Sequence, residues 1–203
     1  SILIPSLGFR EATSFLDVPA EVEIDIDLYV EGTKPEMDSP AYTAEGVVFV
    51  PGKTYTIIAN GLATDGFAEN PNGIPTSFDL FVYDDAKESH ENAEESSIYV
   101  WHGATDAPAV DIYVREVGKV VEAAVYEDRT EYLNVPATEY ILDITVAGST
   151  DVLLSYTADL SSAGGQVVGV LASGFLDPSM DKDGAAFGLL AVFADGSTAL
   201  LPT

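Results

Sequence analysis

Cysteine is absent from the chain, and histidine occurs only at His90 and His102. Without thiols the protein can form neither a disulfide framework nor a thiolate metal site, so packing and hydrogen bonds must stabilise it. Two histidines cannot build a multi-histidine metal centre or a Ser-His-Asp triad in each half of the chain. The Gly-x-Ser-x-Gly, P-loop and Gly-x-Gly-x-x-Gly motifs are also missing. We therefore predict that the protein is not an enzyme.

Basic residues are scarce as well, with 8 against 34 acidic residues and a formal net charge of −26. Such a surface repels phosphate backbones and anionic lipids, so we expect no binding to nucleic acid. A surface this acidic favours cations as partners and is consistent with a saline habitat. The alternative is that the charge only keeps the surface solvated. No apolar run approaches the roughly 20 residues that cross a bilayer, so membrane insertion is not expected. Ser1 opens directly into fold-like sequence, so the leader of an exported protein would not be part of this chain.

An internal repeat is the most informative feature of the sequence. Residues 9–20 align with residues 126–137 at an offset of 117, as from Phe9 to Tyr126, and the match continues through 21–33 against 138–150. Residues 55–61 parallel residues 167–174. Self-similarity of this kind indicates two copies of one structural unit.

Within each copy the apolar residues alternate with polar ones. Val22, Ile24, Ile26 and Leu28 are separated by acidic residues, which predicts a strand with one buried and one wet face. Short runs of Val, Ile, Tyr and Phe lie between Gly, Pro, Asn and Asp clusters, and no stretch shows sustained helical periodicity. We predict an all-β protein of two tandem immunoglobulin-like or Greek-key β-sandwich domains.

The predicted organisation has three parts. Residues 1–84 form the first unit, residues 85–97 an acidic linker, with a short helix as the alternative, and residues 98–203 the second, complete unit. At the offset of 117, Ser1 corresponds to Gly118, so the first unit lacks its first two strands. Either the chain is a piece of a longer tandem protein, or a neighbouring copy supplies the strands and copies join head to tail.

The opening of the second unit carries a recognisable motif. It contains His102, then the turn Asp106-Ala107-Pro108, then Val110-Asp111-Ile112-Tyr113. This resembles the opening of the domain-of-unknown-function 4397 family, although Gly103, Ala104 and Thr105 depart from the family's Ala-Ser-Pro. The resemblance implies an exported β-sandwich protein, often with several units in a row, and no assigned reaction. We interpret His102, Asp106, Pro108 and Asp111 as a structural turn motif, with a ligand or general-base role for His102 as the less favoured alternative.

Two loops are rich in oxygen ligands. One contains Asp177, Asp181 and Asp183, and its counterpart in the first unit contains Asp65, Glu69 and Asn70. Hard cations bind such loops, so calcium is the one cofactor that the sequence suggests, with Asx-type turns as the alternative.

These observations favour an extracellular or cell-surface structural or adhesive protein, in one form a filament subunit joined by strand complementation. Its expected partners are further copies of itself, other cell-surface proteins or glycans. The alternative is a carbohydrate- or protein-binding module of a secreted protein, and a hydrolase with unrecognised carboxylates is the least favoured class.

Overall fold

The computed structural model describes residues 2–33 and 35–203. Within these residues the chain forms strands and one short 3-10 helix, and no α-helix, so the all-β prediction is confirmed. In chain order the elements are β1 (Glu23–Leu28), β2 (Tyr42–Val48), β3 (Thr56–Asn60), β4 (Asp79–Tyr83), β5 (Glu95–His102), β6 (Val110–Val114), β7 (Gly118–Ala124), β8 (Leu133–Pro136), β9 (Glu139–Val146), β10 (Val152–Asp159), β11 (Val167–Ser173), η1 (Pro178–Met180), β12 (Gly188–Phe193) and β13 (Thr198–Leu200).

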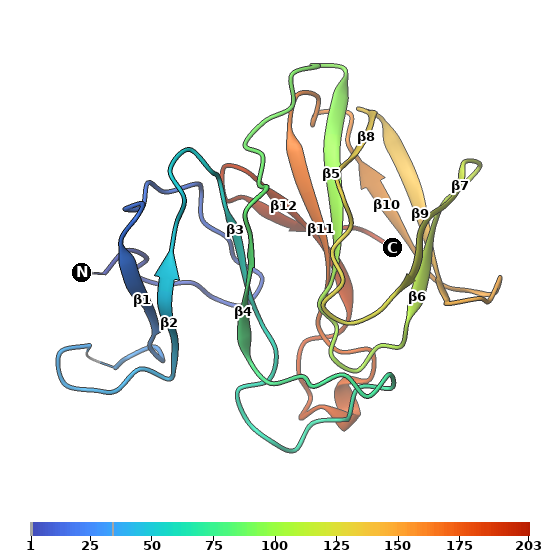
Figure 1. Cartoon of the computed structure of the whole chain (residues 1–203). Coiled ribbons are helices and arrows are strands. Elements are labelled where there is room, and N and C mark those ends of the chain that lie inside the picture. Colours follow the sequence, from blue (N-terminus) through green and yellow to red (C-terminus); the bar gives the residue numbers. More distant parts are fainter. Residues whose placement is uncertain (1, 34) are drawn as a thin grey trace.

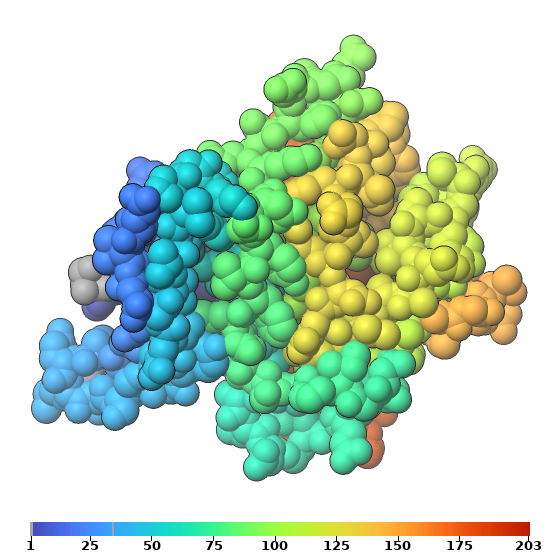
Figure 2. All heavy atoms as spheres, in the orientation of Figure 1, coloured from blue at the N-terminus to red at the C-terminus, as the bar shows by residue number. Residues whose placement is uncertain are grey.

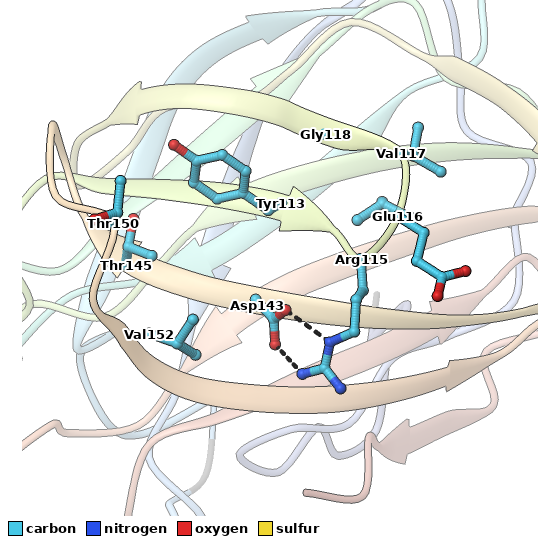
Figure 3. Close-up of a pocket in the computed structure, with 10 residues that line it drawn as sticks. Tyr113, Arg115, Glu116, Val117, Gly118, Asp143, Thr145, Thr150 and Val152 are labelled. Atoms are coloured by element: carbon cyan, nitrogen blue, oxygen red, sulfur yellow. Dashed lines mark hydrogen bonds and ion pairs between the residues drawn. The ribbon is translucent and has the colours of Figure 1, made fainter.

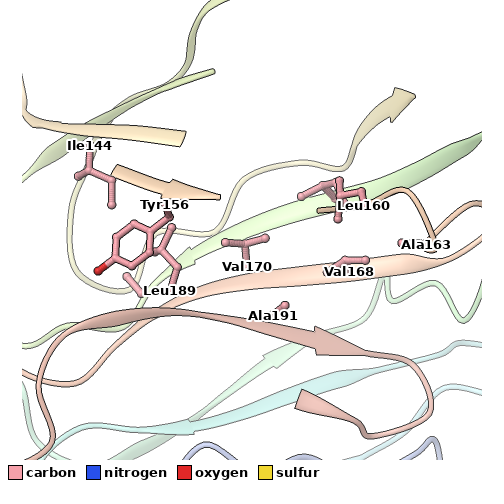
Figure 4. Close-up of a cluster of buried hydrophobic side chains, with 10 residues drawn as sticks. Ile144, Tyr156, Leu160, Ala163, Val168, Val170, Leu189 and Ala191 are labelled. Atoms are coloured by element: carbon pink, nitrogen blue, oxygen red, sulfur yellow. The ribbon is translucent and has the colours of Figure 1, made fainter. Parts of the chain in front are cut away.

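The second unit, β5 to β13, is a complete β-sandwich. One sheet has the strand order β13-β12-β11-β5-β8 and the other the order β10-β9-β6-β7. Only β5 and β11 run parallel, and all other neighbours are antiparallel. Between the sheets lies a core in which Ile144 and Tyr156 of one sheet meet Val168, Val170 and Leu189 of the other (Figure 4). Burial of these side chains is the main stabilisation of the unit.

The first unit contributes only two short sheets, β1-β2 and β3-β4. The pair β3-β4 repeats the register of β11-β12, since Ile57 pairs with Val82 as Val170 pairs with Ala191. A glycine with positive φ follows the strand in each unit, Gly61 after β3 and Gly174 after β11. A parallel bridge comes directly after each glycine. An added Cβ at Gly61 would lie 2.4 Å from a backbone oxygen, and at Gly174 2.5 Å, so both sites require glycine.

The pair β1-β2 corresponds to β9-β10, with β1 116 residues before β9, rather than 117, and β2 112 residues before β10. Thr43 donates a hydrogen bond to Asp27 across β2 and β1 (2.7 Å), and Ser155 donates one to Asp143 across β10 and β9 (2.6 Å). The alignment therefore shifts from an offset of 117 to one of 116 between residues 20 and 23, because the first unit has one extra residue in this stretch. Glu21 lies in this stretch with φ of 59°, a conformation typical of a bulge.

The alternation predicted for β1 is confirmed with one correction. Ile24, Ile26 and Leu28 are half-buried while the acids between them are exposed. Val22, predicted as a core residue, is 51% exposed because it precedes β1, just after the irregular backbone at Glu21.

The two units stack back to back. Figure 1 shows the four sheets in succession from left to right: β1-β2, β3-β4, the five-stranded sheet and the four-stranded sheet. Figure 2 shows the same succession on the surface, from blue to orange. At the junction, Ile58 of β3 packs against Tyr99 and Trp101 of β5, with Phe81 and Leu171 beside them. Both faces of β5 and β11 are therefore covered, which explains why nearly all their residues are buried.

The segment predicted as an acidic linker is irregular only as far as Glu94. Strand β5 begins at Glu95, so the second unit starts three residues before the predicted boundary. Ser96 and Ser97 are fully buried, and Ser96 Oγ donates a hydrogen bond to the carbonyl of Ala163 (2.6 Å). The alternative of a short helix is not realised in this segment. Hydrogen-bonded serines are polar enough to resemble linker residues in a sequence, yet they pack in a sheet.

Candidate functional site

In the second unit, β5 and β6 occupy the middle of their sheets. Strand β5 pairs in parallel with β11, and β6 pairs antiparallel with β9. Of their inward side chains, Ile98 is 9% and Ile112 5% exposed, and the partly buried Val100 and Val110 pack beside them in the core. These two strands therefore complete both the backbone pairing and the core of the unit.

In the first unit the counterparts of β11 and β9 are β3 and β1, and each has a single partner. Within the described residues, β3 pairs only with β4 and β1 only with β2. The positions that β5 and β6 occupy in the second unit have no strand here. Residues 16–19, the counterpart of β8, are irregular as well, because β8 forms by pairing with β5. We refer to the free edges of β3 and β1, with the apolar side chains beside them, as the open edge.

Side chains at equivalent positions show what the open edge leaves uncovered. Ile57 of β3 is 39% exposed, whereas Val170 at the same position of β11 is 5% exposed. Val82 of β4 is 45% exposed, whereas Ala191 is 4% exposed. The register of β3-β4 repeats that of β11-β12, but within the described residues no strand of the first unit takes the positions of β5 and β6, which leaves these side chains more exposed. Exposed apolar surface beside an unpaired sheet edge is a typical site for strand addition.

The residues that precede β1 show the same contrast. Ile4 is 40% exposed, and its counterpart Val121 in β7 is 6% exposed. Phe9 is 66% exposed, and its counterpart Tyr126 is 1% exposed. The local backbone is nevertheless alike, since Arg10 and Glu127, the residues that follow the two rings, both have positive φ, 64° and 76°. The first unit therefore has the local conformation of the second without the strands that would bury it.

The turn motif predicted from the sequence lies in the second unit and connects its loops. The imidazole of His102 is 3% exposed, with Nε2 3.3 Å from the carbonyl oxygen of Pro108, and burial lowers its pKa. Asp106 accepts hydrogen bonds from the backbone N–H groups of Leu176 and Asp177 (2.9 and 2.8 Å). It therefore ties the turn to the loop that contains η1.

Asp111 is a pin between strands on the outer face of the four-stranded sheet. Its carboxylate is fully buried, forms an ion pair with Lys119 (2.8 Å) and accepts hydrogen bonds from the N–H groups of Ala123 (2.7 Å) and Gly148 (3.1 Å). Lys119 and these two bonds lower the pKa of Asp111 to about 2. The arrangement links β6 to β7 and to the β9-β10 hairpin.

The candidate calcium ligands of the second unit, Asp177, Asp181 and Asp183, differ in their surroundings. Asp177 caps η1 by accepting hydrogen bonds from Ser179 (3.1 and 2.6 Å). Asp181 is fully buried, and Asp183 has a left-handed φ of 54°. Among the described residues, no three or more His, Cys, Asp or Glu side chains gather closely enough to hold a metal ion.

The two oxygen-rich loops instead contact each other. Asp181 accepts a hydrogen bond from the N–H of Ala68 (2.7 Å), and the ring of Phe67 stacks on that of Phe175 with centroids 5.6 Å apart. Lys182 lies 4.1 Å from the Phe67 centroid and donates a hydrogen bond to the carbonyl of Asp65 (2.5 Å).

Asn70 of the first-unit loop also reaches the second unit. It is buried and donates a hydrogen bond to the carbonyl of Thr105 (2.8 Å). For Glu69 the structure records no hydrogen bond or ion pair. Sequence reasoning missed this contact between the loops, because the residues that form it are far apart in the chain.

Taken together, these features define a tandem β-sandwich protein with one closed unit and one unit that has an open edge. The family model described as Domain of unknown function (DUF4397) matches residues 1–113 and 96–183, and the chain belongs to this family. The two overlapping matches agree with the internal repeat and with the resemblance at residues 99–114. No curated protein and no solved structure matches the chain significantly. Within the described residues, no helix has the length and apolar character needed to span a membrane.

Proposed function

We propose that this protein is an extracellular or cell-surface structural protein whose open edge accepts a strand pair from a neighbouring polypeptide of the same family. The observation that carries the proposal is the exposure of Ile57 and Val82, whose counterparts Val170 and Ala191 are buried in the core between the two sheets of the complete unit. Joining through an incoming strand is a heterologous contact, which extends a chain of molecules instead of closing a ring.

The second unit provides the template for the incoming pair. A β5-type strand would run parallel to β3, and a β6-type strand would run antiparallel to β1. The far edge of the β6-type strand would face residues 2–4, the counterpart of the part of β7 that includes Val121. Main-chain hydrogen bonds would provide the affinity, and the alternating apolar side chains would provide the specificity.

The donor must be a segment that is not already part of a closed sandwich. In this chain, residues 95–114 are packed in the second unit, where Trp101 is 2% exposed. Exchange of these strands between copies would require that unit to open, so it would be slow. A neighbouring polypeptide with an unengaged β5-β6 pair would bind faster. Because each chain has a formal net charge of −26, association should also strengthen as added salt screens the repulsion between chains.

A synthetic peptide with the sequence of residues 95–114 tests the proposal on the full chain. Hydrogen exchange should show new protection of the β1 and β3 amides at one peptide per chain, and a scrambled peptide should give none. Ile57→Asp should weaken binding at least roughly tenfold, because a charge would then be buried against the incoming strand. Met180→Asp, at a side chain that is 66% exposed on the second unit, serves as the matched control and should bind normally.

Two outcomes would contradict the proposal. One is the absence of protection at β1 and β3 with saturating peptide. The other is equal binding by the Ile57→Asp variant and the unaltered chain. Sedimentation of the full chain over a range of salt concentrations adds an independent readout, since assembly through the open edge should be lost in the same variant.

A further inference from the structure

An open cavity of about 480 Å³, lined by both apolar and polar side chains, lies on the outer face of the four-stranded sheet, away from the open edge. Figure 3 shows Tyr113 and Arg115 on one side of it, Asp143 and Thr145 on the neighbouring strand, and Thr150 and Val152 at the β9-β10 hairpin. Its volume falls within the range of small-molecule sites. We call it the outer groove.

Strand pairing explains why these side chains converge. Strands β6 and β9 are neighbours, with Asp111 opposite Thr145 and Tyr113 opposite Asp143. Side chains of directly opposed residues on one face lie close together, and alternation directs all four away from the core. Regular strands and the Asp111 pin therefore hold Tyr113, Asp143 and Thr145 in the outer groove, while Arg115 and Thr150 lie on the turns that follow β6 and β9.

One group in the outer groove has an unmet hydrogen-bonding capacity. Thr145 is 1% exposed, and its Oγ1 has no hydrogen-bond partner. The residue opposite, Asp111, binds Lys119 and the N–H groups of Ala123 and Gly148 and forms no hydrogen bond with Thr145. Buried hydroxyls without a partner are uncommon and costly. A ligand hydroxyl in the groove would satisfy this one.

The other polar groups in the outer groove are fixed in place. Arg115 donates to both carboxylate oxygens of Asp143 (2.9 and 2.5 Å), and Ser155 donates to the same carboxylate (2.6 Å). The Arg115 side chain is 52% exposed, so part of its guanidinium remains accessible from the groove. A guanidinium has five N–H donors and a carboxylate can accept several bonds, so this pair can both donate to and accept from a ligand.

We propose that the outer groove binds a neutral saccharide. The ring of Tyr113 would pack on the apolar face of a sugar ring, and Thr145, Thr150 and the Arg115-Asp143 pair would bind its hydroxyls. An anionic saccharide fits less well, because Arg115, the basic residue that lines the groove, is already paired with Asp143 and the chain has a net charge of −26. This site is independent of the open edge, and either proposal can fail without the other.

The test is a nuclear magnetic resonance titration of the full chain with maltose, cellobiose and lactose as neutral probes and galacturonate as the anionic probe. At least one neutral disaccharide should shift the amides of Tyr113, Thr145 and Thr150, with a dissociation constant in roughly the millimolar range. Thr145→Val should weaken that binding roughly three- to tenfold, since one hydrogen bond is lost. The same variant should unfold at no lower temperature, because the hydroxyl bonds nothing in the free protein.

Two further variants sharpen the test. Tyr113→Ala should abolish measurable binding, while Thr157→Val, on β10 of the same sheet but outside the groove lining, should bind as the unaltered chain does. Shifts in none of the groove amides with any neutral probe would overturn the proposal. Equal affinity in Thr145→Val, or tighter binding of galacturonate than of the neutral sugars, would also overturn it.

Discussion

Arg129 links the two units, and its replacement tests whether they unfold as one body. Its guanidinium lies 4.7, 4.6 and 4.9 Å from the ring centroids of Tyr83, Tyr99 and Tyr132. It donates two hydrogen bonds to Asp85 (2.9 and 3.0 Å), and its side chain is 7% exposed. Tyr83 ends β4 of the first unit and Asp85 begins the segment between the units, while the other two rings belong to the second unit.

The expected cost of removing this group can be worked from its contacts. Each cation-π contact contributes about 0.5 to 2 kcal/mol, and charge-assisted hydrogen bonds contribute about 1.5 to 3 kcal/mol. Part of this is offset, because Nε and Nη2 of Arg129 are buried without a partner. We expect Arg129→Met to lower the free energy of unfolding by about 3 kcal/mol, and Arg129→Lys by about 2 kcal/mol, since lysine lacks the planar group that lies against the three tyrosine rings. For a chain of this length, about 3 kcal/mol corresponds to a fall of about 6 to 12 °C in Tm.

Urea unfolding provides the assay. Trp101 is the only tryptophan, it is buried at the junction and it donates a hydrogen bond to Tyr83 (2.9 Å), so its fluorescence reports on the contact between the units. Circular dichroism reports on all strands, and the two transitions should coincide. A double-mutant cycle with Asp85→Asn should give a coupling of at least about 1 kcal/mol. A cost below about 0.5 kcal/mol for Arg129→Met would show that Arg129 does not link the units, and a fluorescence transition that precedes the other in the unaltered chain would show that the units do not unfold as one body.

Three further predictions concern pH, equivalent positions and ions. Burial lowers the pKa of His102, so the free energy of unfolding should be constant above pH 6.5 and fall as the pH drops below it. In urea titrations His102→Gln should lose this pH dependence, and an unchanged dependence would count against a buried neutral histidine. Ile57→Asp should change the free energy of unfolding by less than about 0.5 kcal/mol, because Ile57 is partly exposed, whereas Val170→Asp should cost more than about 3 kcal/mol. Equal costs would contradict the difference in packing between these two equivalent positions. Sodium chloride should raise Tm by screening. If the loop that contains Asp181 binds calcium, millimolar calcium at constant ionic strength should raise Tm further and Asp181→Asn should lose this rise, whereas identical curves in chelator and in calcium would refute the site.

The repeat and the alternating pattern predicted most of the fold. Ile24 and Ile26 are half-buried between exposed acids, as their spacing requires. The second unit, which contains the His102 turn near its start, is a complete sandwich. Both predictions depend on local periodicity, which one sequence contains in full. The single-residue slip before β1 could not be predicted in this way, because it depends on a positive φ at Glu21, a residue type that gives no signal for it.

The contacts between the units could not be predicted either. Tyr99 and Trp101 lie on alternate positions of β5 and would face solvent in an isolated sandwich, and the sequence does not indicate that β3 and β4 cover them. The two oxygen-rich loops have the composition of cation-binding loops, yet Ala68 and Lys182 join them to each other. Pairings between residues more than a hundred positions apart depend on the packing of whole units, which local pattern does not encode.

The back-to-back packing also determines how the protein should respond to a protease. The segment from Ala86 to Glu94 is irregular and largely exposed, so it is the natural place for a nick. A cut there would not separate the halves, because the aromatic layer around Trp101, the contact between the two loops and the hydrogen bonds from Arg10 to Ser173 and Ala186 all join residues on opposite sides of it. The nicked protein would migrate as two fragments under denaturing conditions and as one particle under native conditions.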